Sequence, residues 1–446
     1  MLLQFTVNNF SSFKDDVVLS MIPAKSRSMK EHIIKDVVGK STEALPLIVI
    51  YGANASGKTN LVRAFRFLRK IILQGTPADQ NIQITPHKLD PITEKGATKF
   101  EIIFKHNNVV YTYGFLLNSK IILEEWLFGY YTSQESKIFE RITKEDDAIV
   151  EPGQRLISDV ESADFIKYVA KGTRPNQLFL TEGNDKNIKL FKPVIEWMRE
   201  KLIIIGPDSQ YRSLAFRAFK DKKFIEYLSK FLQVADTGIN KIQCEAEVFD
   251  PDKHLSGYPA QFKLKIMEDV NSKSSQYISI GTPDTKAAIS KNEKDSSLTF
   301  LRLKTEHTRT DGKAVLFDIK EESDGTQRLM DLAPMFVDMG DESRVVIIDE
   351  LDRSLHTHLS RLFIQSCLER VSEKKATDQF IVTSHDTNLL DRSLLRRDEI
   401  LFMEKDKAGA SHLSSLSEYN VSEGLNFENG YLNGRFGAVP IIKNTF

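Results

Sequence analysis

The stretch GANASGKT, residues 52 to 59, constrains the fold of this chain more than any other part of its sequence. It fits the pattern G-x-x-x-x-G-K-[ST]. The apolar run LPLIVI precedes it at 45–50, and NLVRAFRFLRKIIL follows with apolar side chains at helical spacing. A strand that turns through glycines into a helix presents backbone N–H groups and the positive helix end to one point. The pattern therefore predicts an α/β fold with a phosphate-binding loop; the alternative is a chance glycine-rich turn.

The side chains of this loop have separate expected roles. Lys58 would reach the β- and γ-phosphates of a bound nucleotide, and the Thr59 hydroxyl would contact Mg²⁺. The candidate nucleotide-binding residues are Gly52, Asn54, Ala55, Ser56, Gly57, Lys58, Thr59 and Asn60.

A second buried strand, VVIIDE at 345–350, ends in two acids. Asp349 can hold Mg²⁺ through its water shell, and Glu350 can orient and deprotonate an attacking water. The alternative is that both acids only cap the next turn, ELDRSLH. Two successive acids at a strand end favour hydrolysis over binding alone.

A third strand, FIVTS at 380–384, is followed by His385. A histidine at this place could hydrogen-bond a γ-phosphate. A single histidine is more often structural. The neighbouring acidic strand favours the functional interpretation here.

The apolar runs come from both ends of the chain and predict a parallel sheet covered by helices. Between them, TKFEIIFK, VVYTYGFLL and KIILEEWLFGYY predict an antiparallel sheet over 98–131. Helical spacing at 188–202 and 224–231 predicts an inserted helical lobe, and the polar segment 271–296 a flexible loop. We expect the divisions 1–160, the N-terminal part of the core, 161–296, a helical insertion, and 297–446, the C-terminal part of the core.

Composition excludes several classes of protein. The net charge of −1 argues against a surface that is basic overall, so any nucleic-acid contact must be local. Cys244 and Cys367 have no spacing that suggests a disulfide framework or a zinc site. The first twenty residues do not resemble a signal peptide, and no apolar run is long enough to span a membrane. We expect a cytoplasmic protein without membrane contact.

The segment EESDGTQRLM at 321–330 predicts a capped helix start. Its N–H groups could either complete a loop or meet a phosphate.

The order GANASGKT, SDGTQRL, VVIIDE, LDRSLH and TSH resembles that of the ABC-type ATPases. Within them, the chain resembles the branch of the SMC-like repair proteins and the bacterial overcoming-lysogenization-defect and abortive-infection ATPases. It is most similar to the AbiL-type or RloA-like ATPases of phage defence. The likeness covers nearly the whole chain, with FTVNNFSSFKDDVVLSM, LRRDEILFMEKD and GYLNGRFGAVP as softer signals. The resemblance implies an ABC-ATPase head that binds ATP and Mg²⁺, with an inserted helical lobe.

The resemblance also implies roles for individual residues. Lys58 and Thr59 would bind phosphate and magnesium, Asp349 magnesium, Glu350 would be the general base and His385 the switch histidine. Ser323 and Gly325 would contact a γ-phosphate held by another subunit, and Asp352 would lie in the loop that crosses between subunits. Asp324 departs from the family pattern, which often has a second glycine there. Gln177 is the candidate for the magnesium-sensing glutamine.

The implied partner is a second copy, in a homodimer or higher homo-oligomer around sandwiched ATP. The residues after His385 carry no cluster of acids typical of a nuclease. The expected effector, a nuclease or toxin, is therefore a separate protein encoded nearby. The basic runs RAFKDKKF at 217–224 and KSRSMK at 25–30 could touch nucleic acid, although such a run more often forms a solvated face.

Three functions remain open from the sequence. The first is a regulatory ATPase of an abortive-infection system, and the second is an SMC-like ATPase of DNA repair or chromosome maintenance. The third, a P-loop kinase for a small molecule, gives no use to the Asp-Glu strand end or the SDGTQ turn.

Overall fold

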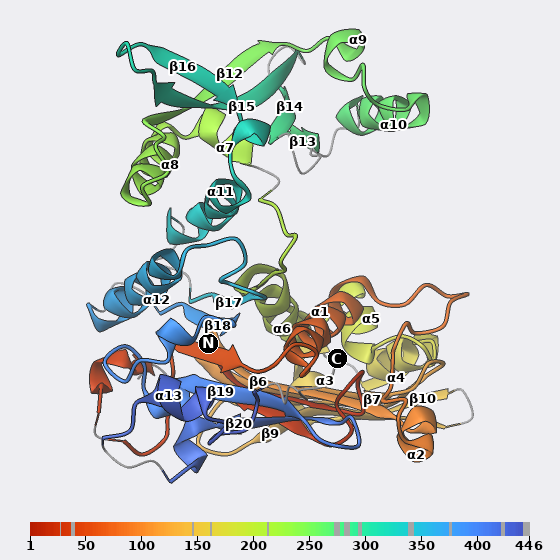
Figure 1. Ribbon diagram of the computed structural model, residues 1–446. Coiled ribbons are helices and arrows are strands. Elements are labelled where there is room, and N and C mark those ends of the chain that lie inside the picture. Colours follow the sequence, from red (N-terminus) through yellow and green to blue (C-terminus); the bar gives the residue numbers. More distant parts are fainter. Residues whose placement is uncertain are drawn as a thin grey trace. The chain divides into compact units, whose positions relative to one another are not determined.

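The computed structural model divides the chain into two compact units (Figure 1). The first unit comprises Met1–Pro207, Gly340–Asp352 and Ser360–Phe446, and the second comprises Asp208–Met339 and Arg353–Leu359. The structure describes residues 1–26, 28–36, 41–144, 147–160, 163–211, 214–271, 277–280, 286–292, 297–337, 343–373, 377–420 and 424–439.

The first unit contains a six-stranded sheet that is parallel except at one edge. Its order is β11 (Leu202–Ile205), β17 (Val345–Ile348), β18 (Gln379–Thr383), β5 (Leu47–Tyr51), β19 (Ile400–Lys405) and β20 (Ser411–Ser415). Every residue of β5, β17 and β18 is buried, as expected for strands covered on both faces. The prediction of a parallel core built from both ends of the chain is confirmed.

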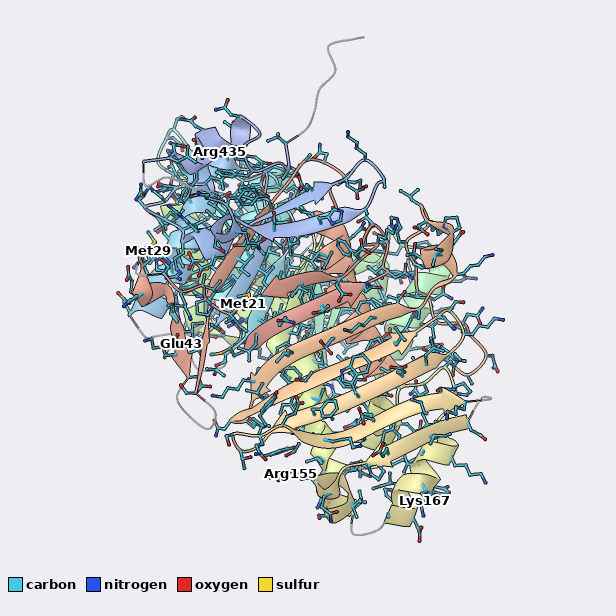
Figure 2. All side chains as sticks on the ribbon, turned by 90° about the horizontal axis from the view of Figure 1, so that it is seen from below. Met21, Met29, Glu43, Arg155, Lys167 and Arg435 are labelled. Atoms are coloured by element: carbon cyan, nitrogen blue, oxygen red, sulfur yellow. The ribbon has the colours of Figure 1, made fainter. Side chains whose placement is uncertain are left out.

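The first unit also contains a seven-stranded antiparallel sheet, seen face-on in Figure 2. Its order is β10 (Asp147–Pro152), β9 (Ser136–Lys144), β8 (Ile122–Tyr130), β7 (Val109–Leu117), β6 (Thr98–His106), β1 (Leu2–Asn8) and β2 (Val17–Ser20). A short pair, β3 (Ile34–Asp36) and β4 (Thr42–Ala44), lies outside it. The predicted antiparallel sheet is therefore correct and extends at both sides beyond 98–131.

Helix α1 (Lys58–Gln74) joins the two sheets of the first unit into one core. Its Phe65 ring stacks on Phe5 of β1 with ring centroids 3.8 Å apart. Its apolar face belongs to the same hydrophobic cluster as Ile48 and Ile50 of β5. Burial of this face fixes the direction of α1 and, with it, the position of the loop that precedes it.

The remaining helices of the first unit are shorter than α1, and all but α12 have ten residues or fewer. They are α2 (Pro91–Lys95), α3 (Gln154–Val160), α4 (Ala163–Gly172), α5 (Phe179–Asp185), α6 (Lys192–Glu196), α12 (Thr357–Ser372), which begins in the second unit, and α13 (Phe427–Leu432). Single helical turns are η1 (Lys30–His32), η2 (Lys189–Phe191), η5 (Thr387–Leu389), η6 (Arg397–Glu399) and η7 (Leu416–Glu418), and η3 (Trp197–Lys201) is a π-helix.

The expected helical insertion 161–296 is wrong in its boundaries and its composition. The helical segment 188–202 packs on the antiparallel sheet of the first unit, where the Trp197 ring lies 4.3 Å from that of Phe104. Phe191 packs against Phe139 of β9 in the same way. Amphipathic spacing shows that a helix buries one face, but it does not show which sheet covers that face.

The second unit combines helices with a sheet of its own. The strands run in the order β12 (Lys241–Val248), β15 (Leu298–Thr308), β14 (Ala287–Lys291) and β13 (Tyr277–Ile280), and β16 (Ala314–Asp318) also pairs with β15. The helices are α7 (Leu214–Lys220), α8 (Lys222–Val234), α9 (Pro251–His254), α10 (Ala260–Asn271), η4 (Ile319–Glu321) and α11 (Asp324–Val337).

The predicted flexible loop at 271–296 is also wrong in part, because β13 and β14 lie within it. β14 is buried apart from its last residue and pairs with the long strand β15, so tertiary contacts override its polar surroundings. Residues 272–276, 281–285 and 293–296 of this segment lie outside the described residues.

Candidate functional site

The phosphate-binding loop connects β5 to α1, as the sequence predicts. Lys58 is the first residue of the helix, and its Nζ donates to the carbonyl oxygens of Gly52 at 2.6 Å and Ala53 at 3.3 Å. Ala55 has a φ of 61° and Gly57 one of 121°, so the backbone turns through left-handed conformations. The loop backbone curves around the Lys58 amine, and a loop of this shape can bind phosphate oxygens.

Two serines outside the sequence motif brace this loop. The Ser411 hydroxyl donates to the Ser56 carbonyl at 2.6 Å, and the Ser411 N–H donates to the Ser12 carbonyl at 2.8 Å. The Asn60 amide donates to the Ser12 hydroxyl at 2.8 Å. A Cβ at Gly57 would lie 2.6 Å from the Ser411 Oγ, so glycine is needed for this close approach. Serines give no distinctive sequence signal, and sequence analysis therefore missed them.

The acidic strand end lies where the sequence predicts, beyond the last residue of β17. Asp349 is 1% exposed, and its Oδ1 accepts a hydrogen bond of 2.8 Å from the Thr383 hydroxyl. Within the described part of the chain, its buried Oδ2 has no hydrogen-bond partner. A buried carboxylate oxygen without a partner is costly unless a ligand reaches it.

Glu350 has a left-handed backbone, with a φ of 53°. Its N–H donates to the Thr383 hydroxyl oxygen at 2.8 Å, so Thr383 holds both acids from the neighbouring strand β18. A non-glycine residue in this conformation costs on the order of 1–3 kcal/mol, and such residues concentrate at functional sites. Thr383 was part of the quoted TSH motif, but its bridging role needed the register of two strands.

His385 and Asp352 lie together at the same edge of the parallel sheet. The His385 N–H donates to both carboxylate oxygens of Asp352, at 3.2 and 3.1 Å. Burial and the charge of Lys58 lower the pKa of His385, while Asp352, Glu350 and Asp349 oppose the shift. Burial likewise lowers the pKa of Lys58, and the three acids oppose that shift. The lysine, the acids and the histidine thus share one electrostatic environment.

The predicted turn at Ser323 lies in the second unit and forms the start of α11. The Thr326 N–H donates to the Ser323 hydroxyl at 3.2 Å, which is the expected N-cap. A Cβ at Gly325 would lie 2.4 Å from the carbonyl oxygen of Ser354, so this turn packs against the segment that follows Asp352. Ser323 and Asp324 are exposed.

Gln177 does not lie at this site, and its expected role in sensing magnesium is wrong. Its side-chain oxygen accepts a hydrogen bond of 3.1 Å from the N–H of Thr76, just beyond the C-terminal end of α1. Lys58 is at the other end of that helix, about 24 Å away at 1.5 Å per residue. The backbone oxygen of Gln177 accepts from Arg141 at 2.5 Å, which makes this residue part of a structural network.

The C-terminal segment 427–438, whose role the sequence left open, packs against the strand that leads into the phosphate-binding loop. Tyr51, the residue before the loop, is fully buried, with its ring 5.9 Å from that of Tyr431 and 6.4 Å from that of Phe402. Phe436 stacks on Phe402 at 5.3 Å. These aromatic contacts hold the segment 427–438 against β19 and β5.

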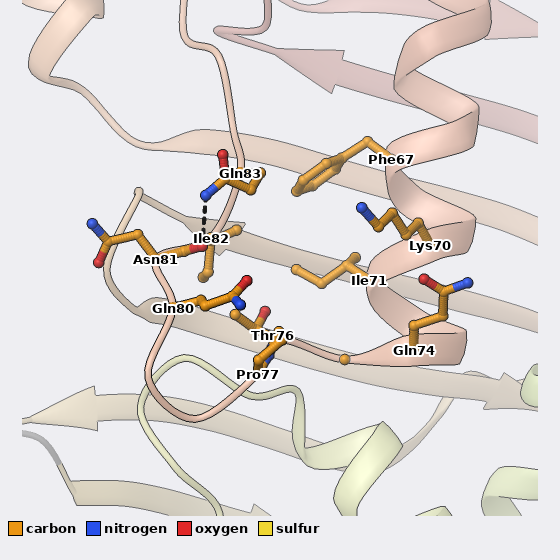
Figure 3. A pocket seen from close by; sticks show the side chains of 11 residues that line it. Phe67, Lys70, Ile71, Gln74, Thr76, Pro77, Gln80, Asn81, Ile82 and Gln83 are labelled. Carbon is orange, nitrogen blue, oxygen red and sulfur yellow. Dashed lines mark hydrogen bonds between the residues drawn. The ribbon is translucent and has the colours of Figure 1, made fainter. Parts of the chain in front are cut away.

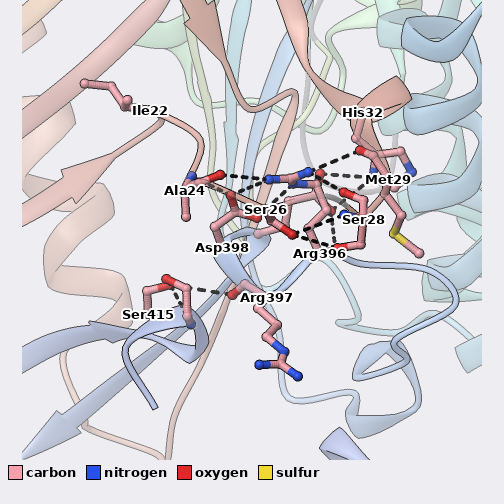
Figure 4. A network of polar contacts seen from close by, with 12 residues as sticks. Ile22, Ala24, Ser26, Ser28, Met29, His32, Arg396, Arg397, Asp398 and Ser415 are labelled. Carbon is pink, nitrogen blue, oxygen red and sulfur yellow. Dashed lines mark hydrogen bonds and ion pairs between the residues drawn. The ribbon is translucent and has the colours of Figure 1, made fainter. Parts of the chain in front are cut away.

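A second polar cluster is structural (Figure 4). The Arg396 guanidinium donates to the Ser28 carbonyl at 2.6 Å and pairs with Asp398 at 2.7 Å. His32 lies 3.1 Å from the Glu399 carboxylate. The cluster ties the segment 22–32 to the chain before β19. Its hydrogen bonds are made within the protein, so it presents no open site.

Residues 47–391 match the family described as "AAA domain, putative AbiEii toxin, Type IV TA system". The chain belongs to this family. The match includes the phosphate-binding loop, the acidic strand end and His385. No protein with a curated description matches the chain significantly.

Several solved structures resemble the chain at low identity. The SMC head domain from Thermotoga maritima has 11% identity and a TM-score of 0.38, covering 94% of this chain and 99% of that chain. An SMC head bound to the C-terminal winged-helix domain of ScpA has 14% identity and a TM-score of 0.36, with coverages of 93% and 97%. The recombination mediator RecF has 12% identity and a TM-score of 0.29, with coverages of 93% and 98%. The fold class follows from the parallel and antiparallel sheets of the first unit.

The site fits Mg²⁺ that is held jointly by protein and nucleotide. Among the described residues, no group of three or more His, Cys, Asp or Glu side chains could hold a metal ion alone. Mg²⁺ in nucleotide sites typically uses one or two carboxylates together with phosphates. The unpartnered Oδ2 of Asp349 meets that requirement.

No helix of the described residues is both long and apolar enough to cross a membrane.

Proposed function

We propose that this AbiEii-type AAA protein binds and hydrolyses ATP, dimerises around ATP, and regulates a partner effector in a bacterial anti-phage system. The observation that carries ATP hydrolysis is the buried Oδ2 of Asp349, which has no hydrogen-bond partner among the described residues, beside Glu350 at the end of a strand in the same parallel sheet as the phosphate-binding loop. The family's description, which names a putative toxin and a type IV toxin–antitoxin system, supports the defence role.

Each residue of the strand edge has a distinct part in the proposed reaction. Lys58 and the loop backbone bind the phosphates, while Thr59 and Asp349 would hold Mg²⁺, which would supply positive charge beside the phosphoryl group. Glu350 accepts a proton from the attacking water. His385 donates a hydrogen bond from its ring to the γ-phosphate, and burial lowers its pKa.

A second copy of the chain completes this site in the proposal. The exposed cap of α11, with Ser323 and Gly325, would meet the γ-phosphate bound by the other copy, because N–H groups of a helix start bind anions. Asp324 adds one negative charge to this turn and weakens the attraction. Asp352, which holds the His385 backbone in its own subunit, would lie beside the dimer contact.

The effector is proposed to be a separate nuclease or toxin in the cytoplasm. The alternative function is an SMC-like ATPase of DNA repair or chromosome maintenance that binds DNA. In the described part of the chain no helix exceeds the 17 residues of α1, so no long coiled-coil arm supports that alternative.

The substitution Glu350→Gln tests hydrolysis and dimerisation together. The variant should bind ATP with ordinary affinity, turn it over roughly a hundredfold more slowly or worse, and accumulate as a dimer or larger assembly with ATP. Light scattering with and without ATP measures the mass. A variant that stays monomeric in saturating ATP would refute the ATP sandwich, and one with unchanged turnover would refute Glu350 as the base.

A further inference from the structure

A cavity of about 210 Å³ lies at the end of α1 opposite to the phosphate-binding loop (Figure 3). One wall is the helix, which contributes Phe67, Lys70, Ile71 and Gln74. The other wall is the segment that follows the helix, including Gln80 and Ile82. The cavity is smaller than the roughly 300–1,000 Å³ typical of drug-sized ligands, so it suits one small group.

Hydrogen bonds from neighbouring segments fix the backbone of the wall opposite α1. Arg174 donates to the Thr76 carbonyl at 2.8 Å, and the Asn176 amide donates to the carbonyls of Pro77 and Gln80 at 3.1 Å each. The Ile82 N–H donates to the Ser119 carbonyl at 2.8 Å. These bonds fix the backbone and leave the Gln80 and Asn81 side chains at the cavity. A rigid wall lowers the entropic cost of binding a ligand.

The cavity offers both an apolar surface and amide groups. One side of the Phe67 ring stacks on Phe100 at 5.1 Å, and Phe67 and Ile82 also line the cavity. Gln74 and Gln80 each present an amide that both donates and accepts. Aromatic and aliphatic surfaces with amides at the edge suit a planar, uncharged ring such as a nucleobase.

The exposed face of α1 is basic and leads to the cavity. The helix contains no Asp or Glu, and Arg63, Arg66 and Lys70 are exposed at spacings of three and four residues. Phe67 and Gln74 share this face at 100° per residue. Arg63 and Lys70 are about 10 Å apart along the helix axis. No acidic side chain is among the described residues that line the cavity.

The polarity of α1 sets the direction in which such a ligand would bind. The C-terminal end of a helix carries partial negative charge and disfavours anions. A phosphate therefore belongs at Lys70, about one turn before the helix end, and the neutral base at Gln74 and the loop.

We propose that this cavity binds one nucleotide unit, with the base between Phe67 and Ile82 and its phosphate on Lys70. The chemistry is shared by a free mononucleotide and by an unpaired nucleotide of a single strand. The site is separate from the ATP site and does not depend on hydrolysis. It also differs from the basic runs at 217–224 and 25–30, the two segments that the sequence offers as candidates for nucleic-acid contact.

The test uses the full chain carrying Lys58→Ala, so that the phosphate-binding loop contributes little. The probes are a fluorescein-labelled ten-nucleotide oligouridylate, followed by anisotropy, and uridine monophosphate as competitor. Adding Lys70→Glu should weaken oligouridylate binding at least tenfold and lower the salt dependence by about one phosphate contact. The matched control Lys171→Glu, at an exposed lysine of α4, should change it less than twofold.

A second variant, Asn81→Trp, fills the cavity mouth without removing a charge and should also weaken binding at least tenfold. Displacement by uridine monophosphate would identify a free mononucleotide as sufficient; Lys70-dependent binding without displacement would identify the strand. The proposal is overturned if the oligouridylate does not bind at physiological salt, or if Lys70→Glu and Lys171→Glu have equal effects. Lys70→Glu alone should keep ATP turnover, which separates this site from the proposed ATPase.

Discussion

At the scale of single residues, Thr383 is the side chain on which the acidic edge depends. Its hydroxyl donates to Asp349 and accepts from the Glu350 N–H, both at 2.8 Å. The sequence identified Asp349, Glu350 and His385 because strand ends with acids are recognisable. It could not identify a threonine whose role depends on the parallel register that places Val382 beside Ile348.

Thr383→Val keeps the shape of the side chain but removes both hydrogen bonds. We expect the free energy of unfolding to fall by about 1–3 kcal/mol, because Oδ1 of the buried Asp349 loses its partner. ATP turnover should fall at least tenfold, with ATP affinity changed much less. Thr383→Ser retains the hydroxyl and should restore turnover. Equal loss in the Val and Ser variants would contradict the bridging role.

The charges around His385 predict opposite effects of two substitutions on its pKa. Lys58 lowers that pKa and Glu350 raises it. Lys58→Ala should therefore raise the pKa of His385, and Glu350→Gln should lower it further. Histidine NMR signals followed through a pH titration measure both shifts. Shifts of the same sign would show that these groups do not share one electrostatic environment.

At the scale of elements, one buried network shows why Gln177 was misassigned. The Glu125 carboxylate accepts from the N–H groups of Phe179 and Leu180 at 2.7 and 3.0 Å and pairs with Arg141 at 3.3 Å. Burial raises the pKa of Glu125, and Arg141 opposes the shift. The network attaches the start of α5 to the antiparallel sheet, and Gln177 joins it through Arg141. The sequence around Gln177 does not show that its backbone oxygen bonds to an arginine on a distant strand, so the structural role of Gln177 could not be predicted.

Gln177→Ala should leave ATP turnover within about twofold of the wild type, because the residue lies about 24 Å from Lys58 along α1. Its loss should lower the melting temperature, since the Thr76 N–H loses its acceptor. A steady-state ATPase assay and a thermal melt measure the two effects. Strong loss of turnover with unchanged stability would restore the magnesium-sensing role.

Arg141→Ala leaves the buried Glu125 without its ionic partner. Removing one member of a buried pair costs about 3–5 kcal/mol. We expect a loss of this size in urea unfolding, whereas Arg392→Ala, at an exposed arginine between η5 and η6, should change stability by less than about 0.5 kcal/mol. Similar losses in both variants would contradict the structural role of the network.

At the scale of the whole molecule, the sequence predicted the architecture of the core better than the boundaries of its parts. The apolar strands at 45–50, 345–350 and 380–384 identified the parallel sheet. A strand that is buried on both faces is apolar at nearly every position, and such a run is easily recognised in a sequence. The inserted lobe was misplaced, because the helices at 188–202 and 224–231 have similar spacing and yet belong to different units. Periodicity identifies a buried face but not the surface that covers it.

The central claim is that each ATP site takes its loop from one copy and its helix cap from another. Lys58→Ala and Ser323→Arg each disable one half of such a site, and each variant alone should be inactive, although Ser323→Arg should still bind ATP. The direct measurement is ATP turnover in an equal mixture of the two variants. Mixed dimers contain one intact site, so the mixture should recover about a quarter of wild-type turnover. A mixture as inactive as its components would contradict the claim, as would wild-type turnover in Ser323→Arg alone.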